Sequence, residues 1–187
     1  MCIRDRVSGG ALRLTARPVV TAGLTKAGAP TQYPCRSGMV TSYPGFRFQY
    51  GYVKVVARMP SGPGLWSAIW MAAADFSWPP EMDVIEHWGL PDNRAGAFFH
   101  PLGAKTTGAV MHGADWSRLS SGWHTFSLNW TPTRMTWFAD GREVFVITKR
   151  VPHQPMYLIA NVADYDMSLP GSCSGEMAIR SVQVWQL

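Results

Sequence analysis

Several features are scarce in this chain of 187 residues, and each scarcity excludes a class of protein. No run of apolar residues is long enough to cross a bilayer, so we expect no membrane-spanning segment. Charged residues make up 16% of the chain, and the Lys and Arg residues behind its net charge of +5 are spread along it. Without a basic cluster, we expect no dedicated nucleic-acid surface. The length suggests one domain with a sizeable core.

Cysteine is also scarce, with three residues, of which Cys2 lies in an unusual segment. Residues 1–6 (MCIRDR) resemble the translation of a sequencing-library adapter, so we expect them to be foreign to the protein. Residues 7–187 then form one domain that lacks its N-terminal strands and its signal peptide. Cys35 and Cys173 either form a disulfide, as in secreted proteins, or are two buried free thiols. Neither lies in a metal-ligand spacing.

Helical periodicity is nearly absent, and short stretches alternate between apolar and polar residues instead. The breaker cluster at 60–64 and the hairpin signal Asp140-Gly141 separate such stretches, whereas residues 101–121 read as a long polar loop. Many short strands with few helices predict an all-β sandwich. We expect strands at 10–16, 48–59, 65–72, 81–86, 95–100, 123–131, 135–139, 143–148, 156–163 and 177–187.

The most informative stretch, EMDVIE at residues 81–86, places three carboxylates among apolar neighbours. In a regular strand Glu81 and Asp83 share a face, and Glu86 points the other way. A β-bulge near Val84 and Ile85 would return Glu86 to the face of the other two. Like charges held so close raise at least one pKa, and a carboxylate beside a protonated carboxyl is what glycosidic-bond cleavage requires. The alternative is an exposed edge strand with incidental charges.

Aromatic residues are abundant, with 9 Trp, 6 Tyr and 8 Phe, and such side chains either fill a core or stack on sugar rings. By strand parity Trp66 and Trp70 share a face, which we place beside the carboxylates as sugar-binding platforms. Trp88 joins the same face once the bulge has formed. His100 is either a structural histidine or a contact of the substrate or of a catalytic carboxylate. Two further tryptophans are assigned to the core: Trp130 and Trp137.

The acidic stretch resembles the E-x-D-x-x-E signature of glycoside hydrolase family 16. Other segments agree in the family's order from about Gly10 to the C-terminus: QYGY at 49–52, RMP at 58–60, GLWSAIWM at 64–71, WHTF at 123–126, FADG at 138–141 and PMYLIAN at 155–161. The resemblance implies a concanavalin A-like β-jelly-roll sandwich whose concave sheet forms a sugar-binding cleft. It makes Glu81 the nucleophile and Glu86 the general acid/base, with Asp83 tuning their protonation. Asn161 is taken as a substrate contact.

The implied reaction is retaining hydrolysis of internal β-linkages in a polysaccharide, with a β-1,3-glucan or a mixed β-1,3/1,4-glucan as the favoured substrate. The six-residue motif is that of laminarinase-like, agarase and carrageenase members, whereas lichenases carry a five-residue form. A transglycosylase of the same fold and a non-catalytic carbohydrate-binding sandwich are the alternatives. We expect a secreted monomer that needs no cofactor and no metal, and the sequence gives no support for the family's structural calcium site.

The chain departs from the family pattern at three places. Lys54 stands where many members carry Glu, and the last strand lacks an Asp that is often found there. Residues 163–166 (ADYD) replace a Gly-Gly pair, which changes one wall of the cleft. This change in the cleft wall leaves the identity of the glucan open.

Overall fold

The computed structural model describes residues 5–90, 94–111 and 119–186, and every regular element within these ranges is a strand. All strand pairs are antiparallel, in one seven-stranded sheet, one six-stranded sheet and one hairpin. The predicted all-β jelly-roll sandwich is confirmed. Among the described residues, no helix is long and apolar enough to span a membrane.

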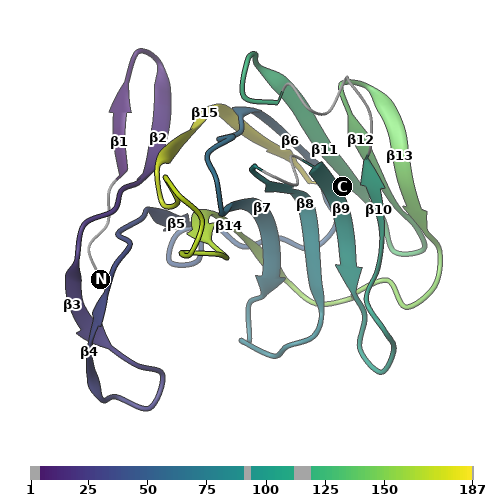
Figure 1. Cartoon of the computed structure of the whole chain (residues 1–187). Coiled ribbons are helices and arrows are strands. Elements are labelled where there is room, and N and C mark those ends of the chain that lie inside the picture. Colours follow the sequence, from purple (N-terminus) through teal and green to yellow (C-terminus); the bar gives the residue numbers. More distant parts are fainter. Residues whose placement is uncertain (1–4, 91–93, 112–118, 187) are drawn as a thin grey trace.

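The seven-stranded sheet has the order β1-β2-β15-β6-β11-β12-β13 (Figure 1). Its strands are β1 (Asp5–Ser8), β2 (Ala11–Ala16), β6 (Gly51–Arg58), β11 (His124–Trp130), β12 (Met135–Ala139), β13 (Arg142–Ile147) and β15 (Gly175–Trp185). Residues 1–4 of the hexapeptide that we expect to be foreign lie outside the described residues, and Asp5 and Arg6 begin β1.

The six-stranded sheet has the order β10-β9-β8-β7-β14-β5. Its strands are β5 (Met39–Thr41), β7 (Leu65–Ala73), β8 (Glu81–Trp88), β9 (Arg94–His100), β10 (Thr107–Met111) and β14 (Met156–Asp164). A separate hairpin of β3 (Thr21–Leu24) and β4 (Pro30–Tyr33) extends away from both sheets in Figure 1. The six-stranded sheet carries the acidic stretch, so it is the sheet that positions the site.

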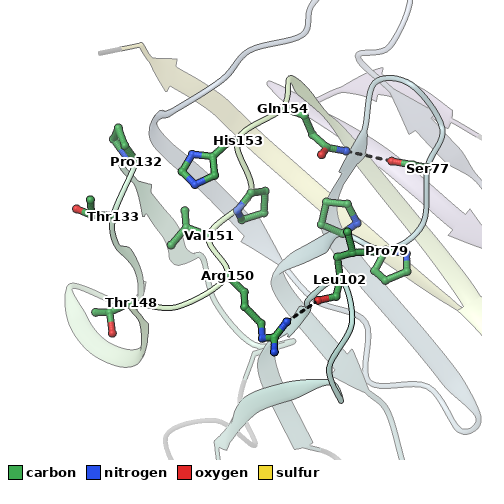
Figure 2. Close-up of a pocket in the computed structure, with 12 residues that line it drawn as sticks. Ser77, Pro79, Leu102, Pro132, Thr133, Thr148, Arg150, Val151, His153 and Gln154 are labelled. Atoms are coloured by element: carbon green, nitrogen blue, oxygen red, sulfur yellow. Dashed lines mark hydrogen bonds between the residues drawn. The ribbon is translucent and has the colours of Figure 1, made fainter.

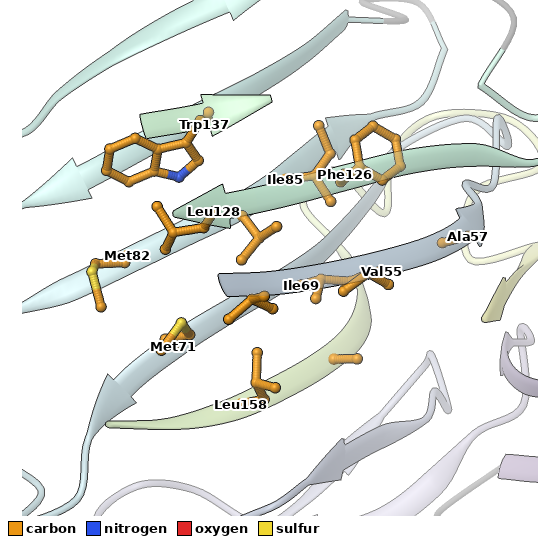
Figure 3. Close-up of a cluster of buried hydrophobic side chains, with 14 of the residues drawn as sticks. Val55, Ala57, Ile69, Met71, Met82, Ile85, Phe126, Leu128, Trp137 and Leu158 are labelled. Atoms are coloured by element: carbon orange, nitrogen blue, oxygen red, sulfur yellow. The ribbon is translucent and has the colours of Figure 1, made fainter. Parts of the chain in front are cut away.

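The core lies between the two sheets and follows directly from the alternation along each strand. In β6 every second residue is buried, so Val53, Val55 and Ala57 point inward. They face inward-pointing residues of the other sheet such as Ile69 and Met71 (Figure 3). Trp130 and Trp137 are fully buried, which confirms their assignment to the core.

Most predicted strands are found with their ends shifted by a few residues, and residues 135–139 match β12 at both ends. Asp140 and Gly141 form the β12–β13 turn with φ of 48° and 79°, a left-handed pair typical of tight hairpins. The prediction of one long loop at 101–121 is wrong in part, because β10 pairs with β9 inside it. β10 has only five residues, TGAVM, which is too short a stretch for a clear alternation of apolar and polar residues.

Cys35 and Cys173 form a disulfide, which settles the alternative between a disulfide and free thiols. The bond joins positions 138 residues apart in sequence and ties the segment after β4 to the segment before β15. Beside it, the backbone N–H of Cys173 donates to the carboxylate of Asp164 at the end of β14. The disulfide therefore fixes the end of a strand that lines the cleft.

Candidate active site

The predicted bulge is present in β8. On the β9 side Asp83 pairs with Phe98 and Glu86 with Gly96, so two residues, Val84 and Ile85, stand opposite one. Both side chains are buried in the core. This extra residue turns Glu86 to the concave face, where Glu81 and Asp83 already point. The alternative of an exposed edge strand is wrong, because β8 pairs with β7 on one side and β9 on the other.

The three carboxylates line a cavity of about 240 Å³ on the concave face. Its other walls come from β7, which pairs with β8, and from β14, which pairs with β7 on the far side. The eight lining residues are Trp66, Ala68, Trp70, Glu81, Asp83, Glu86, Asn161 and Ala163. Ala163 belongs to the segment that departs from the family pattern, and the structure places it in the wall as expected. Strand alternation and one bulge thus gather acids and indoles from three strands.

Glu86 lies in the environment that a general acid requires. Burial raises the pKa of Glu86 to about 8, and the nearby charge of Asp83 adds to the effect. The indole N–H of Trp66 donates to Oε1 of Glu86 at 2.8 Å, which opposes the shift by favouring the ionised form. At neutral pH the Glu86 carboxyl is therefore mostly protonated and can donate a proton.

Glu81 lies at the other end of the acidic row and is held by two donors. The indole N–H of Trp78 donates to its Oε2 at 2.9 Å, and Nε2 of His100 lies 3.4 Å from its Oε1. Burial raises the pKa of Glu81, as does the charge of Asp83, whereas His100 and Trp78 lower it. The two donors therefore favour the carboxylate form that a nucleophile needs.

Asp83 is the most deeply buried of the three acids, with 2% of its side chain exposed. Burial raises its pKa, and the contact with Nε2 of His100, 3.2 Å from its Oδ2, lowers it. The same contact is the main cause that raises the pKa of His100. Thr106 fixes the other side of this ring, with its Oγ1 2.9 Å from Nδ1. His100 therefore contacts two of the three carboxylates.

The remaining predicted contacts are placed as follows. Trp70 lines the cavity and donates from Nε1 to Oδ1 of Asn161 at 2.7 Å, so each orients the other. Trp88 stacks on Trp66 with ring centroids 6.0 Å apart, and the guanidinium of Arg94 lies 4.9 Å from its centroid. Trp88 is thus behind Trp66 rather than in the cavity wall. Whether these side chains contact a sugar is taken up in the proposal below.

Sequence reasoning missed two residues of the site. Trp78 has no predicted role, yet its indole N–H donates to Glu81, the candidate nucleophile. Thr106 falls in the long polar loop predicted at 101–121, yet its hydroxyl bonds His100. The one sequence signal for the role of Trp78 is its position, three residues before Glu81. No local pattern indicates Thr106, because its role depends on the pairing of β9 with β10.

Two groups among the described residues have side-chain atoms close enough to share a metal ion. One is Cys35, Asp164 and Cys173, but its two sulfurs are joined in the disulfide and offer no thiolates. The other is Glu81, Asp83 and His100, whose atoms lie within 4.8 Å of one another. In this second group the histidine already contacts both carboxylates.

A larger cavity of about 590 Å³ lies where four loops meet, and its lining contains no carboxylate (Figure 2). Prolines and aliphatic side chains form much of its wall, and Arg150 donates to the carbonyl of Leu102 at 3.1 Å. Gln154 donates to Oγ of Ser77 at 3.0 Å and so holds the loop that carries Trp78. The size of this cavity does not make it the catalytic site, because no carboxyl group lines it.

The comparisons with known proteins agree with this geometry. The family model described as "Glycosyl hydrolases family 16" matches residues 8–174. Two curated relatives from Rhizobium meliloti are both named endo-1,3-1,4-beta-glycanase. EglC is 33% identical over 97% of this chain and 39% of its own length, and ExsH is 34% identical over 84% and 33%. The chain thus spans between a third and two fifths of these relatives.

Solved structures show the same architecture. The laminarinase catalytic domain from Thermotoga maritima superposes with a TM-score of 0.82 at 25% identity, covering 98% of this chain and 80% of that one. LamAcat from Zobellia galactanivorans also gives 0.82, at 26% identity, with 97% and 80% covered. Similarity therefore extends over nearly the whole chain.

Proposed function

Because the chain belongs to glycosyl hydrolases family 16, we propose that it is a retaining endo-β-glycanase that cleaves internal linkages of a β-1,3- or mixed β-1,3/1,4-glucan. The observation that carries the proposal is the pair of acids at the ends of the bulged row. Burial raises the pKa of Glu86 to about 8. Burial raises the pKa of Glu81 as well, but the contacts with His100 and Trp78 lower that pKa and favour the ionised form. Two carboxyl groups in opposite protonation states are what a retaining glycosidase uses.

In the first step a carboxylate oxygen of Glu81 bonds to the anomeric carbon while the glycosidic C–O bond breaks. The proton of Glu86 moves to the leaving oxygen, so the leaving chain departs as a neutral alcohol. In the second step Glu86, now ionised, takes a proton from water, and the resulting hydroxide displaces Glu81 from the sugar. Through both steps Asp83 and His100 keep the local charge around Glu81 balanced, because the imidazole contacts both carboxylates.

The substrate assignment is supported by the cavity and by the relatives. Trp66 and Trp70 offer indole surfaces beside the acids, and Asn161 orients Trp70. We propose that Trp66, Trp70, His100 and Asn161 contact the sugar, and that Trp88 supports Trp66 from behind. The two relatives named above are endo-1,3-1,4-β-glycanases, which favours a glucan with these linkages.

We also propose that the protein works as a secreted monomer without a cofactor. The disulfide between Cys35 and Cys173 favours an oxidising compartment. The three carboxylates of the cavity all come from one strand, β8, which favours a site that is complete within one chain. The two-step chemistry uses carboxyl groups alone.

The proposal is tested by assaying the purified protein on laminarin, lichenan, agarose and carrageenan. We expect release of reducing ends from the first two, and Glu81→Gln should remove turnover while polymer binding persists. Near-normal turnover by Glu81→Gln would refute the assignment of the nucleophile. Adding oligosaccharide acceptors separates hydrolysis from transglycosylation, because a transglycosylase lengthens the acceptor instead of releasing reducing ends.

A further inference from the structure

A second group of aromatic side chains lies on the concave face, to one side of the acidic row. Tyr157 on β14 and Glu81 on β8 pair with Ala72 of β7 from opposite sides, so their backbones are about 10 Å apart at ~4.8 Å per strand. Tyr157 belongs to the same alternating row of β14 as Asn161, which lines the cavity. Its ring therefore faces the cleft side of the sheet.

Two rings from separate loops pack on Tyr157. Tyr43, after β5, lies 5.0 Å from it between ring centroids, and Phe76, between β7 and β8, lies 6.2 Å from it and 4.6 Å from Tyr43. We call these three residues the aromatic shelf. Phe76 is 66% exposed, although a ring of this size is usually buried. Exposed aromatic clusters beside a cleft mark ligand-binding surfaces.

The outer end of the aromatic shelf carries a positive charge. The guanidinium of Arg47 lies 5.0 Å from the centroid of the Tyr43 ring, and its side chain is exposed. Among the residues that the structure describes, Arg47 forms no ion pair with a carboxylate. A guanidinium stacked on a ring still presents a planar fork of N–H donors, which matches a carboxylate. A neutral glucan has no group that requires this charge.

We propose that the aromatic shelf and Arg47 form a further glycosyl subsite that takes a sugar unit bearing a carboxylate. The inference rests on the function proposed for the neighbouring cleft and names its substrate class as an acidic β-glycan. The sugar ring lies on the shelf, and its carboxylate bonds the guanidinium of Arg47.

The test compares one mixed-linkage glucan with the same glucan after partial oxidation of its C6 hydroxymethyl groups to carboxylates. Affinity is measured by electrophoretic retardation in gels that contain either polymer. All proteins carry Glu81→Gln, so binding is read without hydrolysis, and the parent is compared with added Arg47→Gln, Phe76→Ala or Lys54→Gln. Lys54 alternates with the core residues of β6, so it lies on the outer face of the other sheet and controls for net charge.

We expect the parent to prefer the carboxylated polymer, and Arg47→Gln to lower that preference about tenfold. Phe76→Ala should weaken binding of both polymers about fivefold, because it removes the shelf rather than the charge. Lys54→Gln should leave the preference as in the parent. The inference is overturned if the parent shows no preference, if Arg47→Gln keeps it, or if Lys54→Gln reduces it equally. Failure of the proposed function shows separately, as absence of turnover by the unmodified protein on the neutral polymer.

Discussion

The indole N–H of Trp137 donates to the backbone carbonyl of Asp83 at 2.9 Å, across the core between the two sheets. Trp137 belongs to β12 in the seven-stranded sheet, and Asp83 lies where the bulge interrupts the pairing of β8. A bulge removes ladder hydrogen bonds, and a buried carbonyl without a partner is costly. A core residue thus satisfies the backbone group that the catalytic row frees (Figure 3 shows the position of Trp137).

Trp137→Phe should therefore lower both stability and catalysis. The variant keeps a ring but leaves the Asp83 carbonyl unpaired, which should cost about 1–3 kcal/mol in the free energy of unfolding. Because the bulge aims Glu86, we also expect kcat to fall. Urea denaturation and initial rates on the preferred polymer measure the two effects.

Trp130→Phe is the matched control for this prediction. Trp130 is equally buried and donates to the carbonyl of Pro152 at 3.2 Å, away from the bulge. The Trp130→Phe variant should lose a similar amount of stability but keep its kcat. If both variants lose kcat equally, the link between Trp137 and the bulge is contradicted.

The pKa of Glu86 predicts the alkaline limit of activity. Since burial raises that pKa to about 8, kcat/KM should fall as the pH rises through 8, when the acid loses its proton. Trp66→Phe removes a hydrogen bond that favours the ionised form, so the alkaline limb should move to higher pH. A pH profile measures both limbs, and a shift to lower pH in this variant would contradict the assignment of Glu86 as the acid.

The contact of His100 with Glu81 should influence the acidic limb of the pH profile of kcat/KM. Its contact lowers the pKa of Glu81, so His100→Asn should raise that pKa and move the acidic limb of kcat/KM to higher pH. Thr106→Val frees the other side of the ring and should shift the limb in the same direction by less. A purely structural role for His100 would lower the rate at all pH values without moving the limb.

The disulfide should contribute to stability more than to catalysis at room temperature. Cys35→Ala/Cys173→Ala removes a cross-link between distant positions and should cost about 2–5 kcal/mol in the free energy of unfolding. Denaturation with and without reductant checks this for the unmodified protein. Unchanged stability after reduction would show that the bond constrains little in the unfolded chain.

The parts of the fold and site that follow from local pattern were predictable from the sequence. Alternation located most strands, and parity alone showed that Glu86 needs a bulge to join Glu81 and Asp83. The bulge lies at Val84 and Ile85, where the pattern indicated it. Parity also showed that Trp66 and Trp70 share a face, and in the structure both line the cavity beside the acids.

Contacts between distant segments were not predictable in this way. Trp137 read correctly as a core residue, but its bond to Asp83 depends on how the two sheets face each other. Thr106 reaches His100 because β9 and β10 pair, and Tyr43 meets Phe76 because two loops converge. Such relationships come from packing of elements that no local window of sequence contains.

The most direct test of the account is to trap the covalent intermediate. A 2-deoxy-2-fluoro-β-glucosyl fluoride of matching linkage slows the second step, so the sugar accumulates on the nucleophile. Fragmentation of the labelled peptide by mass spectrometry then assigns the ester to one side chain. We predict the label on Glu81 and none on Glu86. A label on Glu86, or turnover without any covalent adduct, would contradict the retaining mechanism with these roles.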